Sequence, residues 1–187
     1  MKITSYTLIA LLGILFTVAC GNSNNAKESN NPEAIFKIEG AKEEVLKKFP
    51  DGKSQLSVFK DEKTNEKIAE VEFHPDGKTY LEKHFKSEQL NGESYSFYPD
   101  GKQWSLNTYK DGQYHGRWKA WWPNGVIRLE GNYEFGVANG EWFFYHDNGK
   151  IDTRGFYHQG QKTGIWTSYN KEGGLVRETD YSAAKQP

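Results

Sequence analysis

Apolar and polar residues follow a repeated pattern along most of this chain. Short aromatic-rich segments, RWKAW (117–121), EWFFY (141–145) and IWTSY (165–169), have the composition of β-strands. After a short turn, each is followed by a second strand-like segment, VIRLEGNY (126–133), KIDTRGFY (150–157) or GLVRETDY (174–181). The pattern therefore predicts a series of two-stranded units.

Glycines mark the turns of these units at a constant spacing of 24 residues. The turns HPDGK, YPDGK, WPNGV, HDNGK and KEGG contain Gly77, Gly101, Gly125, Gly149 and Gly173. Proline presets φ, Asp or Asn tolerates the next position, and glycine supplies the left-handed residue that closes a hairpin. We expect positive φ at Gly125 and Gly149.

A second set of glycines, Gly92, Gly116, Gly140 and Gly164, has the same spacing. It lies in the connections from one hairpin to the next, such as KDGQYHG (110–116), which we expect to be looser loops. The predicted fold is all-β: an antiparallel meander of repeated 24-residue hairpins that forms an elongated solenoid or sheet.

Aromatic residues occupy fixed positions in this repeat. One column is Trp118, Trp142 and Trp166; a second is Phe49, Phe73, Phe97, Trp121, Tyr145 and Tyr169; a third is Phe85, Tyr109, Tyr133, Tyr157 and Tyr181. Because an isolated hairpin is unstable in water, we expect the three tryptophans to form a structural ladder between stacked hairpins.

Trp121 lies an odd number of residues from Trp118, so it points to the opposite face of an unbroken strand. Its row, Trp121, Tyr145 and Tyr169, is the candidate binding surface if it is exposed. The alternative is that this row is core. In that case the connections 111–116, 135–140 and 159–164 remain as the candidate surface.

The units YKDGQYHGRWKAWWPNG (109–125) and YEFGVANGEWFFYHDNG (133–149) resemble the bacterial variant of the MORN repeat. The resemblance covers residues 70–182 and extends to antitoxin-like proteins of the YwqK family. It implies a non-enzymatic scaffold that contacts proteins or lipids. Glu88 departs from the pattern where a turn glycine is expected, and so does Thr179-Asp180 where better units have Gly-Asn.

The N-terminus has the features of an export signal. Lys2 precedes the apolar run LIALLGILFTVA (8–19), which is short for a membrane-spanning helix. TVAC (17–20) is similar to a bacterial lipobox, so residues 1–19 are expected to be a lipoprotein signal peptide and Cys20 the lipidated residue. In the alternative, the signal is cleaved elsewhere and Cys20 is incidental.

Three further segments complete the predicted organisation. The polar residues 20–33 are expected to form a flexible tether, and residues 183–187 a short tail. Residues 34–69 are expected to be a divergent segment that caps the repeats, although AKEEVLKKF (41–49) is also compatible with a short helix. Gly21 favours delivery to the outer membrane if the host is Gram-negative.

Charge and chemistry narrow the function. Lys and Arg number 24 against 25 Asp and Glu, without a basic stripe, so no nucleic-acid partner is expected. The five histidines lack metal-ligand spacing, and the glycines recur in turns rather than in a phosphate loop, so we expect neither a metal nor a cofactor.

Without a recognisable catalytic motif, we expect no enzyme. We expect a membrane-anchored binding or scaffold module of the cell envelope whose partner is a protein or an envelope polymer. The alternative is an antitoxin or immunity-type protein that neutralises a toxin.

Overall fold

The computed structural model describes residue 38 and residues 40–182, and every regular element within them is a β-strand. The fourteen strands are β1 (Ala41–Lys48), β2 (Ser54–Asp61), β3 (Lys67–Phe73), β4 (Thr79–Lys86), β5 (Gln89–Leu90), β6 (Gly92–Phe97), β7 (Gln103–Lys110), β8 (Gln113–Trp121), β9 (Ile127–Glu134), β10 (Val137–Ala138), β11 (Gly140–Tyr145), β12 (Ile151–His158), β13 (Gln161–Tyr169) and β14 (Leu175–Asp180).

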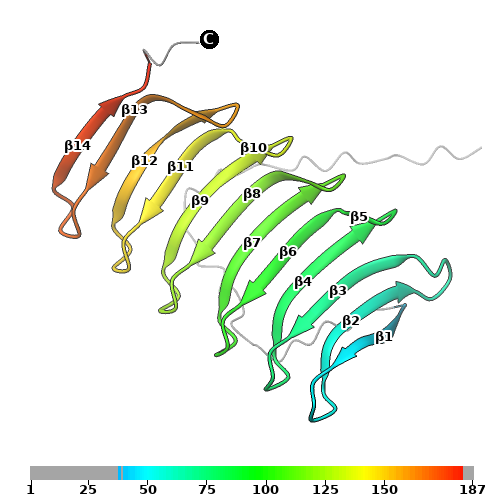
Figure 1. Cartoon of the computed structure of the whole chain (residues 1–187). Coiled ribbons are helices and arrows are strands. Elements are labelled where there is room, and N and C mark those ends of the chain that lie inside the picture. Colours follow the sequence, from blue (N-terminus) through cyan, green and yellow to red (C-terminus); the bar gives the residue numbers. More distant parts are fainter. Residues whose placement is uncertain (1–37, 39, 183–187) are drawn as a thin grey trace, which may run out of the picture.

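All strands belong to one antiparallel meander. Neighbours in the sheet are consecutive in the chain, in the order β1-β2-β3-β4-β6-β7-β8-β9-β11-β12-β13-β14, with β5 paired to β4 and β10 paired to β9 (Figure 1). This confirms the predicted all-β fold class and the hairpin repeat. Each strand therefore touches its sequence neighbours and makes no pairing across the molecule.

One edge of the sheet, the lower edge in Figure 1, is built from three-residue turns. In the turn between β8 and β9, the amide of Gly125 donates to the carbonyl of Trp122 at 2.8 Å, and the Asn124 side chain accepts from the amide of Val126 at 3.1 Å. The turn glycines Gly77, Gly101, Gly125, Gly149 and Gly173 have φ between 84° and 93°. These are the positive φ values that the turn motifs predict.

The opposite edge, the upper edge in Figure 1, is tighter than predicted. The connections expected to be loose loops are two-residue turns, since β7 ends at Lys110 and β8 begins at Gln113. Both turn residues have positive φ, as a type I′ hairpin requires: Ser87-Glu88, Asp111-Gly112, Phe135-Gly136 and Gln159-Gly160. The second glycine of the connection lies inside the following strand at a bulge in two cases, Gly116 with φ of 100° and Gly164 with φ of 63°, whereas Gly92 and Gly140 begin β6 and β11.

The N-terminal segment is the divergent hairpin and not a helix, because β1 pairs with β2 from Ala41↔Asp61 to Lys48↔Ser54. Its turn also corrects the predicted aromatic column. The amide of Phe49 donates to the carbonyl of Lys53, as that of His74 does to Lys78. Phe49 is therefore equivalent to His74 and not to Phe73, because this turn sits one residue earlier in the repeat.

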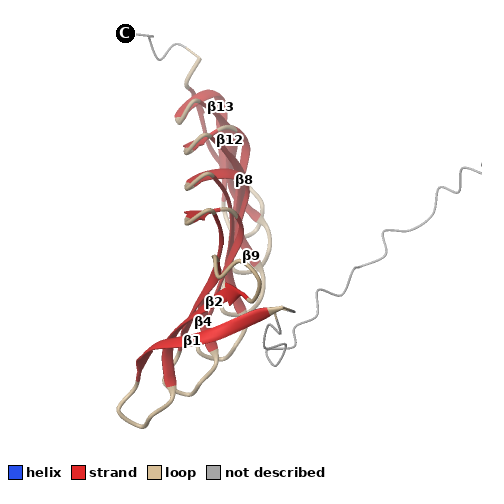
Figure 2. Ribbon diagram, turned by 90° about the vertical axis from the view of Figure 1, so that its right-hand side faces the viewer, coloured by secondary structure: helices blue, strands red, loops and turns tan. Residues whose placement is uncertain are grey.

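The sheet is a thin, curved single layer when it is viewed from the side (Figure 2). Within the described part of the chain, no helix is long and apolar enough to cross a membrane. The predicted signal peptide (1–19), Cys20, the tether (20–33) and the tail (183–187) lie outside the described residues. The structure therefore describes the repeat sheet and does not test the predictions for these terminal segments.

Candidate interaction surfaces

The tryptophan ladder lies on one face of the sheet, here called the aromatic face. Ring centroids 4.6–6.4 Å apart form a continuous chain through β7 to β14. Its members are Tyr109, Tyr114, Trp118, Tyr133, Trp142, Phe144, Tyr157, Trp166 and Tyr181. Tyrosines of the third predicted column contact the tryptophans on both sides, as Tyr133 does with Trp118 and Trp142, which also contact each other.

Glycines on neighbouring strands make room for these tryptophans. A Cβ at Gly131 would overlap the indole of Trp142, and a Cβ at Gly155 would overlap the indole of Trp166. Both tryptophans are buried, with exposed fractions of 3% and 4%. Each indole thus lies on bare backbone, and the strip serves mainly as the core of a single-layer sheet.

The predicted binding row does not form an open surface. Trp121 is buried with an exposed fraction of 7%, so it does not meet the condition of exposure for a binding row and fits the alternative that this row is core. Tyr145 is half-buried, and its hydroxyl donates to Glu130 at 2.7 Å. Burial together with this bond raises the pKa of Tyr145. Charged side chains lie on the same face as this row, among them Lys119 and Glu130, which form an ion pair at 3.3 Å.

A column of polar rings that the sequence analysis did not single out links the three-residue turns. At four of these turns, the residue just before the three turn residues bonds the backbone carbonyl 23 residues further along the chain through its side chain. The pairs are His74 with Phe97, Tyr98 with Trp121, Trp122 with Tyr145 and His146 with Tyr169, at 2.8–3.2 Å. Their 24-residue spacing was visible, but two were assessed only as possible metal ligands.

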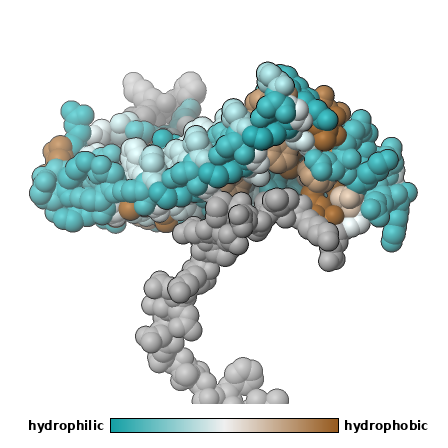
Figure 3. All heavy atoms as spheres, turned by 90° about the horizontal axis from the view of Figure 1, so that it is seen from below, coloured by the Kyte–Doolittle hydropathy of each residue, from teal (hydrophilic) through white to brown (hydrophobic). Residues whose placement is uncertain are grey.

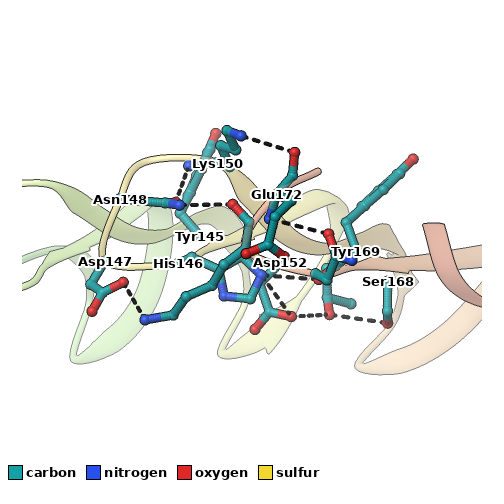
Figure 4. A network of polar contacts seen from close by, with 12 residues as sticks. Tyr145, His146, Asp147, Asn148, Lys150, Asp152, Ser168, Tyr169 and Glu172 are labelled. Carbon is teal, nitrogen blue, oxygen red and sulfur yellow. Dashed lines mark hydrogen bonds and ion pairs between the residues drawn. The ribbon is translucent and has the colours of Figure 1, made fainter. Parts of the chain in front are cut away.

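Other side chains strengthen the same edge, as the turns 146–150 and 170–174 show (Figure 4). Asn148 donates to the carbonyl of Lys171 at 2.8 Å, and Lys150 donates to that of Glu172 at 2.9 Å. Lys171 in turn reaches Asp147 at 2.7 Å. Hydrophilic residues dominate this edge when the molecule is viewed from below (Figure 3).

On the face opposite the aromatic face, His84 lies between two acceptors. Its Nε2 is 2.9 Å from Oε1 of the fully buried Glu82, and its Nδ1 is 2.6 Å from the carbonyl of Glu93. Only the doubly protonated imidazolium can donate to both. The hydrogen bond to Glu82 accordingly raises the pKa of His84, against the opposing effect of burial.

Exposed apolar side chains gather at the two-residue turn between β9 and β10. Phe135 is 69% exposed, Val137 is 41% exposed, and Tyr114 on the adjacent strand is 39% exposed. The turns are held together by backbone, since the amide of Gly136 donates to the carbonyl of Tyr114 at 2.9 Å. This site falls within the connection 135–140, which the sequence analysis kept as its second candidate surface.

The described residues show little that points to metal chemistry. Over residue 38 and residues 40–182, no group of three or more His, Cys, Asp and Glu side chains is placed to hold a metal ion. One shallow hollow of about 260 Å³ is lined by Arg117, Lys119, Glu130 and Glu141 together with Trp118, Gly131, Asn132 and Phe143. Lys119 and Glu130 form an ion pair within this lining.

Comparisons with known proteins bear on the repeat. The family model described as MORN repeat variant matches residues 90–111, 114–134 and 138–159. No curated protein matches the chain.

Solved structures are similar only locally. A mutant of S. aureus TarM in complex with fondaparinux, α-GlcNAc-glycerol and UDP is 14% identical, with a TM-score of 0.27 over 67% of this chain and 21% of that chain. The Glycosylation Associate Protein complex from Streptococcus agalactiae is 16% identical, with a TM-score of 0.30 over 74% of this chain and 20% of that chain.

With TM-scores this low, and with only about a fifth of those chains covered, neither structure defines the function of this protein. The three matched units lie between β5 and β12, and each spans one three-residue turn, whereas the type I′ turns lie at the boundaries of the units. Three units of the chain, within residues 90–159, are therefore similar to the MORN repeat variant.

Proposed function

We propose that the protein is a non-catalytic scaffold of the bacterial cell envelope, which is anchored by its N-terminus and binds a partner along its repeat sheet. One observation carries the proposal: the described chain forms one long single layer in which each hairpin contacts only its neighbours. Such a sheet presents extended faces and edges, as repeat proteins with a binding role do. The partner is a protein or an envelope polymer.

The sheet is built to hold its shape without a second layer. Turn-to-turn hydrogen bonds connect its lower edge, and the aromatic strip fills the space that a packed layer would otherwise fill. A rigid surface loses little conformational freedom on binding, which favours affinity. These features support a scaffold role more directly than a catalytic one.

Chemical crosslinking in intact cells tests the binding function. We expect an amine-reactive reagent to produce a discrete adduct of the full chain with a partner. The Gly155→Ala variant, which disturbs the aromatic strip, should lose that adduct, whereas an exposed substitution such as Gln161→Ser should keep it. A chain that yields no adduct under any condition would contradict the proposal.

Membrane anchoring through Cys20 is tested separately. Cys20→Ala should move the protein from the membrane pellet to the soluble fraction, because acyl chains supply the anchoring energy. The nearby Ser23→Ala substitution serves as the control and should leave the protein in the pellet. If the Cys20 variant stays in the washed pellet, the lipoprotein assignment is wrong.

A further inference from the structure

The turn between β9 and β10 contains a residue that the local backbone does not favour. Phe135 is the first residue of a type I′ turn and has φ of 48°. The equivalent positions hold Ser87, Asp111 and Gln159. Asn, Asp and Gly are the residues that tolerate this conformation, whereas a bulky aromatic side chain is strained in it.

Packing does not compensate for this strain. The phenyl ring is 69% exposed, and it meets the His115 ring edge-on at a centroid distance of 5.2 Å. Val137, directly after the turn, is also exposed, and the turn meets the adjacent strand where the amide of Gly136 donates to the backbone carbonyl of Tyr114. A strained and exposed aromatic residue that contributes little to the fold indicates a role outside the fold.

We propose that Phe135, with the exposed Val137 next to its turn, is the anchor with which the scaffold docks into an apolar pocket of a partner protein. The proposal rests on the scaffold function above and specifies the surface and the chemistry of the partner. An aromatic ring that is fully desolvated in a pocket is a frequent centre of binding energy in protein interfaces. The turn that contains Phe135 joins β9 to β10 at the upper edge of the sheet (Figure 1).

Charge favours a protein pocket over a lipid surface. Within residues 131–140 the only charged residue is Glu134, which is exposed and precedes Phe135 directly. Insertion of the ring into a bilayer would draw this carboxylate toward the hydrocarbon, and a single small apolar group gives only marginal membrane binding. A pocket with a basic group at its rim accommodates both the ring and the carboxylate.

The first test measures stability. Removal of a large apolar residue usually destabilises a protein, whereas the proposal predicts that removal of the Phe135 ring stabilises this one. Phe135→Asn should raise the melting temperature of the full chain by about 2–4 °C, since Asn tolerates the positive φ. Gln159→Asn, at the same position of the next turn, is the matched control and should give a similar or smaller rise. A lower melting temperature for Phe135→Asn would show that the ring stabilises the hairpin and would overturn the proposal.

The second test locates the contact in living cells. A photoreactive amino acid replaces Gln113, which is exposed and adjacent to Tyr114, in chains that carry Phe135, Phe135→Asn or Gln159→Asn. We expect one discrete protein adduct with Phe135 and with Gln159→Asn, and about tenfold less with Phe135→Asn.

Each other outcome decides against the anchor in a distinguishable way. An adduct of equal yield in the Phe135→Asn chain leaves the scaffold function intact but excludes Phe135 as its anchor. A Phe135-dependent adduct that mass spectrometry identifies as a lipid places the ring in a membrane instead. The absence of adducts here and with the amine-reactive reagent removes the scaffold function itself, and the anchor with it.

Discussion

At the scale of single residues, the aromatic strip depends on what lies beneath each indole. Gly131 and Gly155 let Trp142 and Trp166 lie on bare backbone, whereas Trp118 pairs with Asn107 and is only half-buried. The exposure of a tryptophan in this repeat therefore follows from the residue on the neighbouring strand. The missing side chain at 131 or 155 is as important to packing as the ring that covers it.

Gly131→Ala should consequently destabilise the protein by about 1–3 kcal/mol or more, because the methyl group overlaps the Trp142 ring. Denaturant unfolding of the purified chain measures the effect. Thr179→Ala changes the equivalent position of the last repeat and should cost less than about 1 kcal/mol. Equal effects for the two variants would show that close packing at Gly131 is unimportant.

The ionic contacts of His84 predict a dependence of stability on pH. The pKa of His84 is raised above its ordinary value of 6.5 in the folded protein. Its contribution to the free energy of unfolding is therefore fully present below pH 6.5 and is lost as the pH rises through the higher pKa of the folded state. Glu82, Glu93 and Tyr95 surround it, and Tyr95 donates a hydrogen bond to Glu93.

The wild-type chain should therefore lose stability between about pH 6 and about pH 9, and His84→Gln should lose less over the same interval. Melting temperatures at the two pH values measure this. An unchanged pH dependence in the variant would assign the effect to other groups.

At the scale of the hairpin, each turn both closes its own unit and holds the next. Asp or Asn fixes the turn internally, as Asn124 does for Val126, while the residue just before the turn reaches forward to the following hairpin. Hydrogen bonds of this kind contribute about 0.5–1.5 kcal/mol each. Because the forward bonds recur at four successive turns on this edge, the stacking of hairpins does not depend on side-chain packing alone.

Tyr98→Phe isolates one such bond, since it removes only the hydroxyl that donates to the carbonyl of Trp121 at 2.8 Å. We expect a loss of about 0.5–1.5 kcal/mol in the free energy of unfolding. Tyr133→Phe makes the same chemical change on the aromatic face, outside this column, and should have a smaller effect. A loss that is no larger at Tyr98 would contradict the turn-to-turn role.

The repeat period, the hairpins and the turn glycines were all predictable, because glycine and Asx motifs act locally and recur in register. The two-residue turns of the upper edge could not be predicted, because Ser87-Glu88 and Phe135-Gly136 adopt type I′ geometry without the Asn-Gly or Asp-Gly pair that is typical of it. Burial of Trp121 was also unpredictable from parity alone. Parity assigns a side chain to a face, but the neighbouring strands determine how far that side chain is covered.

At the scale of the whole molecule, a sheet in which contacts are limited to adjacent strands should respond to damage locally. Gly155→Ala should increase amide hydrogen exchange in β11 to β14 far more than in β1 to β4. In the unmodified chain, exchange should be fastest in the end strands β1 and β14. Exchange that rises uniformly along the sheet would instead indicate one cooperative unit, and mass spectrometry of exchanged peptides distinguishes the two.

The identical spacing of the turns makes length an adjustable property of this architecture. Each 24-residue unit adds two strands, or about 10 Å, and meets its neighbours through the same turn bonds and the same ring contacts. Duplication of one unit within a gene would therefore extend the protein without requiring a new interface. The distance between the two ends of such a molecule can therefore change during evolution in fixed steps, one repeat at a time.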